Sequence, residues 1–394
     1  MNAPLHGITV IDMSRALAGP FAAMTLGDLG AEVIKVEDPR GGDVTRGYPP
    51  FWNGESTYYM SANRNKRSLT VNLESETGRE IVRQLVGTAD ILIESFRTGA
   101  MEAWDLGCDA LRAGNPRLIY CAVSAVGRDG PDKDRAGVDL LMQAYAGLMS
   151  ITGEPGRPPV RTGTSVVDLT TGANAVQGIL AALYVRERSG QGQRVDVSLL
   201  GSVVSWLSYH LVGYFGTGNV PGPMGSAHPS VAPYGTYPTR DGFIVIAVAL
   251  DSSWKRLCVA MERPDLIDHP EFARNASRIA NRERLDIVLS EILAAKTAAE
   301  WTAVMDKHGV PASPINSIDQ VVNLPQTLHQ ELVVPVPHPT IPDLRTQGIA
   351  IKLAETPGSI RRSPPLLGEH TDEILSELGF EAGAISDMRA QGTV

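Results

Sequence analysis

Short apolar runs alternate with helical patterns over the first 125 residues of the chain. The runs are rich in β-branched side chains, which is typical of strands buried within a sheet. Strands separated by helices predict βαβ units, a parallel sheet and right-handed crossovers. We expect helices at Pro20–Leu29 and Glu76–Val86. The expected strands, in chain order, are Ile8–Asp12, Ala31–Val36, Ser68–Leu73, Asp90–Glu94 and Arg117–Val123.

The pattern becomes helical after Gly137. Asp139–Met149 predicts one helix, and Ala173–Arg188 shows the clearest amphipathic periodicity in the chain. Arg194–Ser198 predicts a further strand. Gly201–Phe215 is apolar around most of its circumference, so we expect a helix that is buried on several sides, including against another subunit.

A stretch rich in Gly, Pro and Ser, Gly216–Tyr237, predicts a long loop. The strand Asp241–Leu250 and the helices after it predict a smaller second domain of roughly 110 residues. From His329 the chain shows short strands and turns that end in Leu366–Gly379. The helices expected in the second domain are Ser252–Met261, Ile279–Ala295 and Ala298–His308.

The composition is that of a globular protein with two to three domains, since the chain has 394 residues, 43% of them hydrophobic. The formal charge of −9 gives no support to non-specific nucleic-acid binding, although a local basic patch can hold an anion. No apolar run predicts a membrane span, and the first residues do not resemble a signal peptide. Three widely spaced cysteines predict neither disulfides nor zinc, so we expect a reducing cytoplasm; they are Cys108, Cys121 and Cys258.

The first turn between a strand and a helix, Asp12–Pro20, is the natural place for a nucleotide, but it lacks the common motifs. It holds one glycine, Gly19, where the dinucleotide fingerprint needs three. The chain also has no P-loop, no G-x-S-x-G turn and no histidines at metal-ligand spacing. We expect neither NAD, FAD nor a metal. A ligand at the carboxyl ends of the strands remains expected, because open α/β sheets bind there.

Asp168 stands where the β-branched run Thr164–Val167 meets a helical pattern. The local sequence alone favours a helix N-cap, whose carboxylate accepts backbone N–H groups. The same position also suits a nucleophile, because the helix dipole keeps a carboxylate ionised and nearby N–H groups stabilise an oxyanion. Local sequence leaves both interpretations open.

Six segments of the chain resemble the class III CoA-transferase family, also called CaiB/BaiF. They occur in the family's order from residue 5 to the C-terminus, so the resemblance covers nearly the whole chain. It implies that Asp168 is the catalytic aspartate. The segments are Leu17–Phe21, Leu29–Glu37, Gly42–Gly47, Asn63–Ser68, Val167–Leu169 and Pro364–Thr371.

The resemblance implies a covalent mechanism. Asp168 attacks the acyl carbonyl of a CoA thioester and forms a mixed anhydride with release of CoA thiolate. The thiolate then forms an aspartyl-CoA thioester, and an acceptor carboxylate collects the CoA through a second anhydride. Such a route divides one difficult transfer into easier steps. It needs no metal and no permanently bound cofactor, and the CoA thioester is a co-substrate.

The family fold implied by the resemblance is α/β, with a Rossmann-like parallel-sheet large domain and a smaller α+β domain. Two subunits form an interlocked-ring homodimer. For this chain we expect a large CoA-binding domain at residues 1–215 and 330–394, a linker at 216–224 and a small domain at 225–325.

The CoA contacts of the family carry over to positions at the ends of several predicted strands. Two arginines of the family are Asp38 and Ala103 here, so the phosphate contacts must come from other residues. Arg15, Arg46 and Arg97 are the candidates. The other expected CoA contacts are Ala16, Leu17, Ala18, Val71, Asn72, Leu73, Ser95, Phe96, Val138 and Asp139.

Two alternative functions follow from the same resemblance. Acyl-CoA racemases of the superfamily use a histidine where this chain has Val138, and valine cannot carry a proton. Transferases more often have an aromatic residue there, so Val138 departs from both patterns and could widen the acyl pocket. A non-catalytic acyl-CoA-binding subunit would lack the aspartate, so Asp168 argues against it.

The segment Gly225–Tyr234 bears on the acceptor. Its pattern resembles transferases that use succinyl-CoA and pass CoA to a small dicarboxylate such as glutarate, itaconate, malate or mesaconate. His228 and Ser230 are expected to hydrogen-bond the distal carboxylate, and loop packing is the alternative role for His228. We expect these substrates and a second copy of the chain as partners, with no nucleic acid or membrane.

Overall fold

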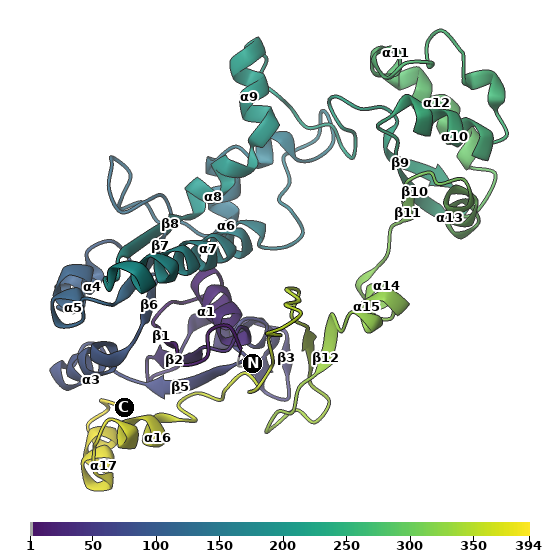
Figure 1. The fold of residues 1–394 in the computed structure, drawn as a ribbon. Helices are drawn as coiled ribbons and strands as arrows, with labels where there is room; N and C mark the ends of the chain where they lie inside the picture. The colour runs from purple at the N-terminus through teal and green to yellow at the C-terminus, as the bar shows by residue number, and fades with distance from the viewer. Residues whose placement is uncertain (1–2) are drawn as a thin grey trace. The chain divides into compact units, whose positions relative to one another are not determined.

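The computed structural model describes residues 3–394. Met1 and Asn2, which belong to the N-terminal segment discussed above for a signal peptide, lie outside the described residues. The chain divides into two compact units (Figure 1). Unit 1 contains the residues up to Gly147 together with Thr162–Tyr209 and Pro325–Val394. Unit 2 contains Leu148–Arg161 and His210–Leu324. These boundaries differ from the expected ones, because residues 148–161 and the expected linker both group with unit 2.

A six-stranded parallel sheet forms the centre of unit 1, in the order β5-β2-β1-β6-β7-β8. The expected α/β architecture with a parallel sheet is confirmed. The strand order reverses between β1 and β6, which creates the crevice at which such sheets bind ligands. The strands are β1 (Thr9–Asp12), β2 (Glu32–Glu37), β5 (Lys66–Thr70), β6 (Ile91–Glu94), β7 (Ile119–Ser124) and β8 (Arg194–Ser198).

Helices cover the two faces of this sheet. The core on one face joins apolar side chains of the sheet to those of α3, α5, α16 and α17, so the C-terminal end of the chain completes unit 1. On the other face α7 contacts α1, α8, β7 and β8. The helices of unit 1 that take part are α1 (Ala18–Asp28), α3 (Glu76–Thr88), α5 (Cys108–Gly114), α7 (Val166–Ser189), α8 (Leu199–Trp206), α16 (Thr371–Glu377) and α17 (Ala382–Ala390).

Helix α7 is long and apolar enough to cross a membrane by length and composition alone. In this fold it is a packing helix of the sheet, and it approaches α1 very closely. A Cβ atom on Gly172 would lie 2.6 Å from the carbonyl oxygen of Ala18, so only glycine allows this contact. The close approach brings the start of α7 next to the first loop of the sheet.

The expected helix Gly201–Phe215 is two helices instead. Helix α8 ends at Trp206, and α9 (Ser208–Thr217) starts at Ser208, whose φ of 40° interrupts the helix. The expectation of burial on several sides is wrong for α9 within the chain, because none of its residues is buried. Val212 and Phe215 are 69% and 72% exposed.

Unit 2 is a three-stranded antiparallel sheet, β11-β10-β9, with helices around a core that includes Trp254 and Leu289. Strand β9 begins in the expected loop, and it tolerates Pro238 because it is an edge strand. The strands are β9 (Tyr234–Thr239), β10 (Gly242–Ala247) and β11 (Ala312–Pro314). The helices are α10 (Asp251–Ala260), α11 (Asn275–Ala280), α12 (Arg282–Leu293), α13 (Ala298–Lys307) and α14 (Ile318–Val321).

Shorter elements complete unit 1. Two small hairpin sheets pair β3 with β4 and β12 with β13. Helix α6 precedes the junction with unit 2 and contacts α7 and α8. These elements are β3 (Phe51–Trp52), β4 (Glu55–Ser56), β12 (Val333–Pro335), β13 (Arg345–Gln347), α2 (Thr57–Met60), α4 (Ala100–Ala103), α6 (Asp139–Tyr145) and α15 (Pro325–His329).

Candidate active site

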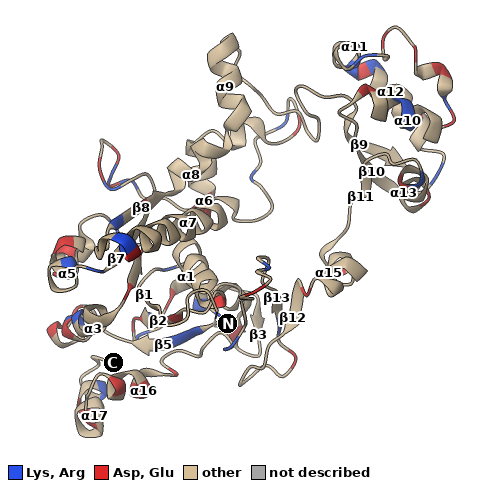
Figure 2. Ribbon diagram, in the orientation of Figure 1, with Lys and Arg blue, Asp and Glu red and all other residues tan. Residues whose placement is uncertain are grey.

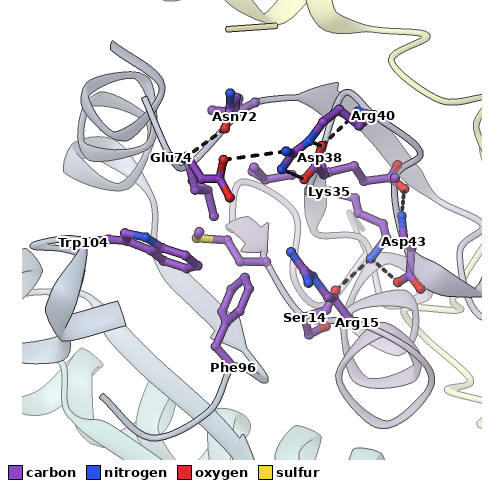
Figure 3. Close-up of a pocket in the computed structure, with 16 residues that line it drawn as sticks. Ser14, Arg15, Lys35, Asp38, Arg40, Asp43, Asn72, Glu74, Phe96 and Trp104 are labelled. Atoms are coloured by element: carbon purple, nitrogen blue, oxygen red, sulfur yellow. Dashed lines mark hydrogen bonds and ion pairs between the residues drawn. The ribbon is translucent and has the colours of Figure 1, made fainter. Parts of the chain in front are cut away.

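Two cavities open at the carboxyl ends of the strands in unit 1, and they share Arg15 and Phe96. Cavity A has a volume of about 530 Å³ and contains Asp168 in its wall. Its other lining residues are Arg15–Ala18, Ser95–Thr98, Val123–Ala125, Lys133–Val138 and Leu199. Cavity B, shown in Figure 3, is smaller, about 70 Å³, and lies beside Val71–Leu73, Phe96 and Trp104.

The first loop, between β1 and α1, forms one wall of cavity A. The backbone N–H of Arg15 donates to Ser95 Oγ at 2.8 Å, and that of Ala16 donates to Asp43 Oδ1 at 3.3 Å. Ala16 has a φ of 65°, a left-handed conformation that costs energy for any residue except glycine. The loop is therefore held in one shape by its neighbours. It places the expected contacts Arg15, Ala16, Leu17 and Ala18 in the cavity wall.

Two buried lysines support this loop from below. Lys66 Nζ lies 2.8 Å from Asp12 Oδ2, and Lys35 Nζ lies 3.1 Å from Asp43 Oδ2 and donates to the carbonyl of Ser14. Burial raises the pKa of Asp12, but the ammonium groups of Lys35 and Lys66 outweigh it and hold that pKa below its usual value. Burial lowers the pKa of Lys66 to about 8. Sequence reasoning missed this ion-pair network, although Lys66 lies in a segment that carries the family resemblance.

Asp168 lies in the first turn of α7. The N-cap of the helix is Ser165, so the interpretation of Asp168 as an N-cap residue is wrong. The helix starts seven residues earlier than the amphipathic pattern indicated, because its first two turns contact α1 and α6 as well as solvent. Burial, and next the negative charge of Asp139, raise the pKa of Asp168 to about 7. Its carboxyl group is thus a half-buried group with a raised pKa in the wall of a large cavity.

Asp139 has a different place from the one expected. Its Oδ2 accepts the N–H groups of Val167 at 2.8 Å and of Asp168 at 3.3 Å, and Gln143 donates to its Oδ1. Gln143 in turn accepts the N–H of Thr162 at 3.0 Å. Asp139 is therefore buried under the start of α7, is not among the residues that line cavity A, and caps the first turn of the helix that carries Asp168.

Tyr58 lines neither cavity but interacts electrostatically with Asp168, and the sequence did not single it out. It comes from α2 and interacts electrostatically with Asp168, at the start of α7, and with Asp139. Burial raises the pKa of the Tyr58 phenol, and the negative charges of Asp168 and Asp139 raise it further. The phenol is therefore kept in its neutral form. No signal in the sequence singles out this tyrosine, because it reaches α7 from a short helix more than 100 residues away.

Four basic side chains line cavity A. Arg15 and Arg97 were expected there, and Arg15 lies over the ring of Phe96, 4.9 Å from its centroid. Lys133 and Arg135 were not expected, because they belong to an irregular loop. Val138 also lines the cavity and is 61% exposed. These four positive charges suit the cavity for an anionic ligand.

Cavity B combines an apolar floor with a charged rim. Phe96 and Trp104 meet edge to face with ring centroids 5.2 Å apart, and Figure 3 shows both rings facing the cavity. At the rim Arg40 donates to Asp38 at 2.8 and 3.0 Å and lies 3.6 Å from Glu74. Arg40 is thus the basic group nearest to the position where the family has an arginine and this chain has Asp38.

Arg46 is part of the core instead of the site. Its guanidinium forms two hydrogen bonds of 2.8 Å with Glu37 and lies 3.7 Å from the centroid of the Tyr59 ring. Its side chain is 11% exposed and lines neither cavity. The expectation that Arg46 holds a CoA phosphate therefore has no support from the structure, because the guanidinium group that would bind the phosphate is already paired with Glu37.

His228 and Ser230 lie on an exposed turn of unit 2. The backbone N–H of Ser230 donates to Nδ1 of His228 at 3.1 Å. The His228 and Tyr234 rings are 5.4 Å apart. Among residues 3–394, no group of His, Cys, Asp and Glu side chains could hold a metal ion.

The fold places the carboxyl group of Asp168 and four basic side chains around one cavity at the carboxyl ends of a parallel sheet. The family model of CoA-transferase family III matches residues 5–371. The chain therefore belongs to CoA-transferase family III, and the protein is a CoA-transferase that uses CoA thioesters as co-substrates.

Named relatives cover almost the full length of the chain. It is 39% identical to the succinyl-CoA:glutarate CoA-transferase of Homo sapiens, over 99% of this chain and 90% of the relative. It is also 39% identical to the succinate–glutarate CoA-transferase of Agrobacterium fabrum, over 95% of this chain and 96% of the relative. The succinyl-CoA:mesaconate CoA-transferase of Haloarcula marismortui is 39% identical, over 96% and 97%.

A solved structure has the same fold. It is that of a CAIB/BAIF family protein from Brucella suis, which superposes with a TM-score of 0.87. The two chains are 36% identical, and the match covers 96% of this chain and all of the other.

Proposed function

We propose that this protein transfers CoA from succinyl-CoA to a small dicarboxylate through a covalent intermediate on Asp168. The observation that carries the proposal is the position of Asp168 on the wall of cavity A, where burial and Asp139 give its carboxyl a pKa of about 7. The names of the relatives, which act on glutarate and mesaconate, support the choice of substrates.

In the first half-reaction, an Asp168 oxygen attacks the thioester carbonyl carbon, the C–S bond breaks, and CoA leaves as a thiolate. The thiolate then attacks the Asp168 carbonyl of the anhydride and releases succinate. The second half-reaction runs these steps in reverse with the acceptor carboxylate. Tyr58 interacts electrostatically with Asp168, and we assign its hydroxyl as a donor to the oxyanion that forms at each attack.

The rest of CoA is assigned to the two cavities. The basic residues Arg15, Arg97, Lys133 and Arg135 hold its phosphate groups at the rim of cavity A. Cavity B holds the adenine between Val71–Leu73 and the rings of Phe96 and Trp104. Ser95 contributes through the first loop, whose Arg15 N–H it accepts.

The acceptor is assigned to the turn that carries His228 and Ser230. A site for a dicarboxylate needs hydrogen-bond donors for the distal carboxylate. The side chains of His228 and Ser230 supply a ring N–H and a hydroxyl for this purpose. Glutarate, itaconate, malate and mesaconate are the acceptors to be tested. We place the reaction in the cytoplasm.

The working enzyme is an interlocked homodimer. Helices α8 and α9 carry no charged side chains, as Figure 2 shows, and several of their large apolar side chains are exposed within one chain. Such a surface requires a partner. Sedimentation at micromolar concentration should give the mass of two chains, and a monomer would contradict this assignment.

The covalent step is tested by trapping. The protein is incubated with succinyl-CoA and hydroxylamine, and peptides are analysed by mass spectrometry for a hydroxamate at Asp168. Asp168→Ala should show no modification and should lose more than about 10³-fold in transfer rate. Full activity of this variant, or trapping at another residue, would contradict the proposal.

A further inference from the structure

The turn that carries His228 and Ser230 is held by side chains from a single short segment, α11 and the start of α12. Asn275 bonds to the turn twice: its Nδ2 donates to the carbonyl of Ser230 at 3.0 Å, and its Oδ1 accepts the N–H of Ala232 at 3.1 Å. Arg278 Nε donates to the carbonyl of Ala232 at 2.6 Å. The end of the turn is thus fixed by two side chains one helical turn apart.

Arg282 fixes the other part of the turn. Its Nη2 donates to the carbonyl of His228 at 2.7 Å and to that of Val231 at 3.1 Å. His228 and Val231 are also the two residues of an antiparallel backbone bridge. One guanidinium nitrogen therefore joins both ends of the tight turn on which Ser230 stands.

Arg278 is a structural residue. It is fully buried, bonds to the carbonyl of Phe272 and to Asp251, and lies over the ring of Trp254. Removing it would leave several buried acceptors without a donor, which destabilises a fold. Arg282 differs because it lies at the start of α12 and is half-buried, so its loss changes the turn more than the core.

The turn also sets the state of the His228 ring. Because Nδ1 accepts the N–H of Ser230, the proton of neutral His228 lies on Nε2. The direction of that N–H depends on where the backbone of residues 228–231 stands. Any change in the turn therefore redirects the donor.

We propose that Arg282 is a positioning residue for acceptor selection: by bonding the carbonyls of His228 and Val231, it orients the His228 ring toward the distal carboxylate of a dicarboxylate. This inference rests on the proposed role of His228 in the function above. Arg282 itself does not touch the substrate. Its effect belongs to the dicarboxylate-specific part of binding and leaves CoA binding unchanged.

The test compares Arg282→Met and Arg282→Lys with the matched control Arg284→Met. Arg284 lies on the same helix but pairs with Glu271 at the surface. For each variant we would measure kcat/KM for glutarate and for pentanoate, which has the same length and one carboxylate, together with the dissociation constant of free CoA.

Arg282→Met should lower the ratio of glutarate to pentanoate kcat/KM about tenfold, mainly through the KM for glutarate, which is the effect of one lost charge-assisted contact. The dissociation constant of CoA should stay within twofold. Arg282→Lys should recover part of the ratio, and Arg284→Met should leave it unchanged. An equal loss with both acceptors, or an unchanged ratio, would overturn the inference.

His228→Ala separates this inference from the proposed function. If His228→Ala lowers the ratio and folded Arg282 variants do not, the proposed function stands and the role of Arg282 is wrong. If none of the variants lowers the ratio, the turn does not bind the acceptor. If Arg282→Met does not fold, Arg282→Lys decides by the same ratio.

Discussion

The Oδ2 atom of Asp139 accepts the backbone N–H of Asp168 at 3.3 Å. A carboxylate of α6 thus caps the helix that carries the proposed nucleophile, Asp168, and holds a second negative charge next to it. The cap fixes the start of α7, and the charge, after burial, raises the pKa of Asp168 to about 7. Asp139 therefore contributes both to the position of Asp168 and, after burial, to its raised pKa.

The first prediction concerns the pH dependence of the covalent step. In the proposed mechanism only ionised Asp168 attacks, so the single-turnover release of CoA from succinyl-CoA should rise as the pH increases through about 7. Asp139→Asn keeps an acceptor for the two N–H groups but removes the charge. The rising limb should then move to lower pH, and an unmoved limb would show that Asp139 does not set the ionisation of Asp168.

The second prediction concerns stability. Because the pKa of Asp168 is raised above its usual 3.8 in the folded state, ionisation of this group costs stability as the pH rises from about 4 to about 7. Asp168→Asn should therefore be more stable than the parent at pH 8, on the order of 1 kcal/mol or more, and show a smaller difference at pH 4. Urea unfolding at both pH values measures this. The exposed Asp109→Asn is the control for the loss of one surface charge.

The third prediction concerns the contact between α1 and α7. Gly172→Ala would place a Cβ 2.6 Å from the carbonyl of Ala18, so the helices must move apart and Asp168 must move away from the first loop. We expect a loss of about 1–3 kcal/mol in the free energy of unfolding and a larger than tenfold loss in transfer rate. Gly87→Ala on α3 meets nothing within 4 Å and should leave both unchanged. Normal activity of Gly172→Ala would show that this helix contact does not position the nucleophile.

The fourth prediction separates two arginines that look alike in the sequence. Arg46→Met leaves Glu37 buried without its partner and should lower the free energy of unfolding by about 3–5 kcal/mol. Arg15→Met should leave stability nearly unchanged and raise the KM for succinyl-CoA, because this side chain is exposed in the wall of cavity A. Thermal melts and steady-state kinetics on both variants decide. If Arg46→Met instead raised the KM for succinyl-CoA and left stability unchanged, Arg46 would belong to the CoA site.

The sheet could be predicted because buried parallel strands are continuous apolar runs. Ile8–Asp12 and Asp90–Glu94 coincide with β1 and β6 to within one residue at each end. Strand β9 was missed because Gly235 and Pro238 interrupt its pattern, and an edge strand tolerates both. The break at Ser208 between α8 and α9 has no apolar signature either, since both helices remain apolar.

Only part of the candidate site could be predicted, because some of its residues lie in segments without a recognisable pattern. Asp168 and the first loop follow from segments that match the family in order. Lys133, Arg135 and Tyr58 come from an irregular loop and a single-turn helix, where no periodicity marks a residue. Arg46 and Asp139 were placed in the CoA site from their type and position, but their partners, Glu37 and the N–H groups of α7, lie on other elements.

The sequence by itself determined the parallel sheet and the family, and it singled out Asp168 as the residue we propose as the nucleophile. These depend on local pattern and on short segments in a set order. Only the tertiary structure decided which charged groups reach a cavity and which are paired inside the core. It also decided the ionisation of Asp168, because burial and the charge of Asp139 act through space, and residues 29 positions apart become neighbours only when α6 packs beneath α7.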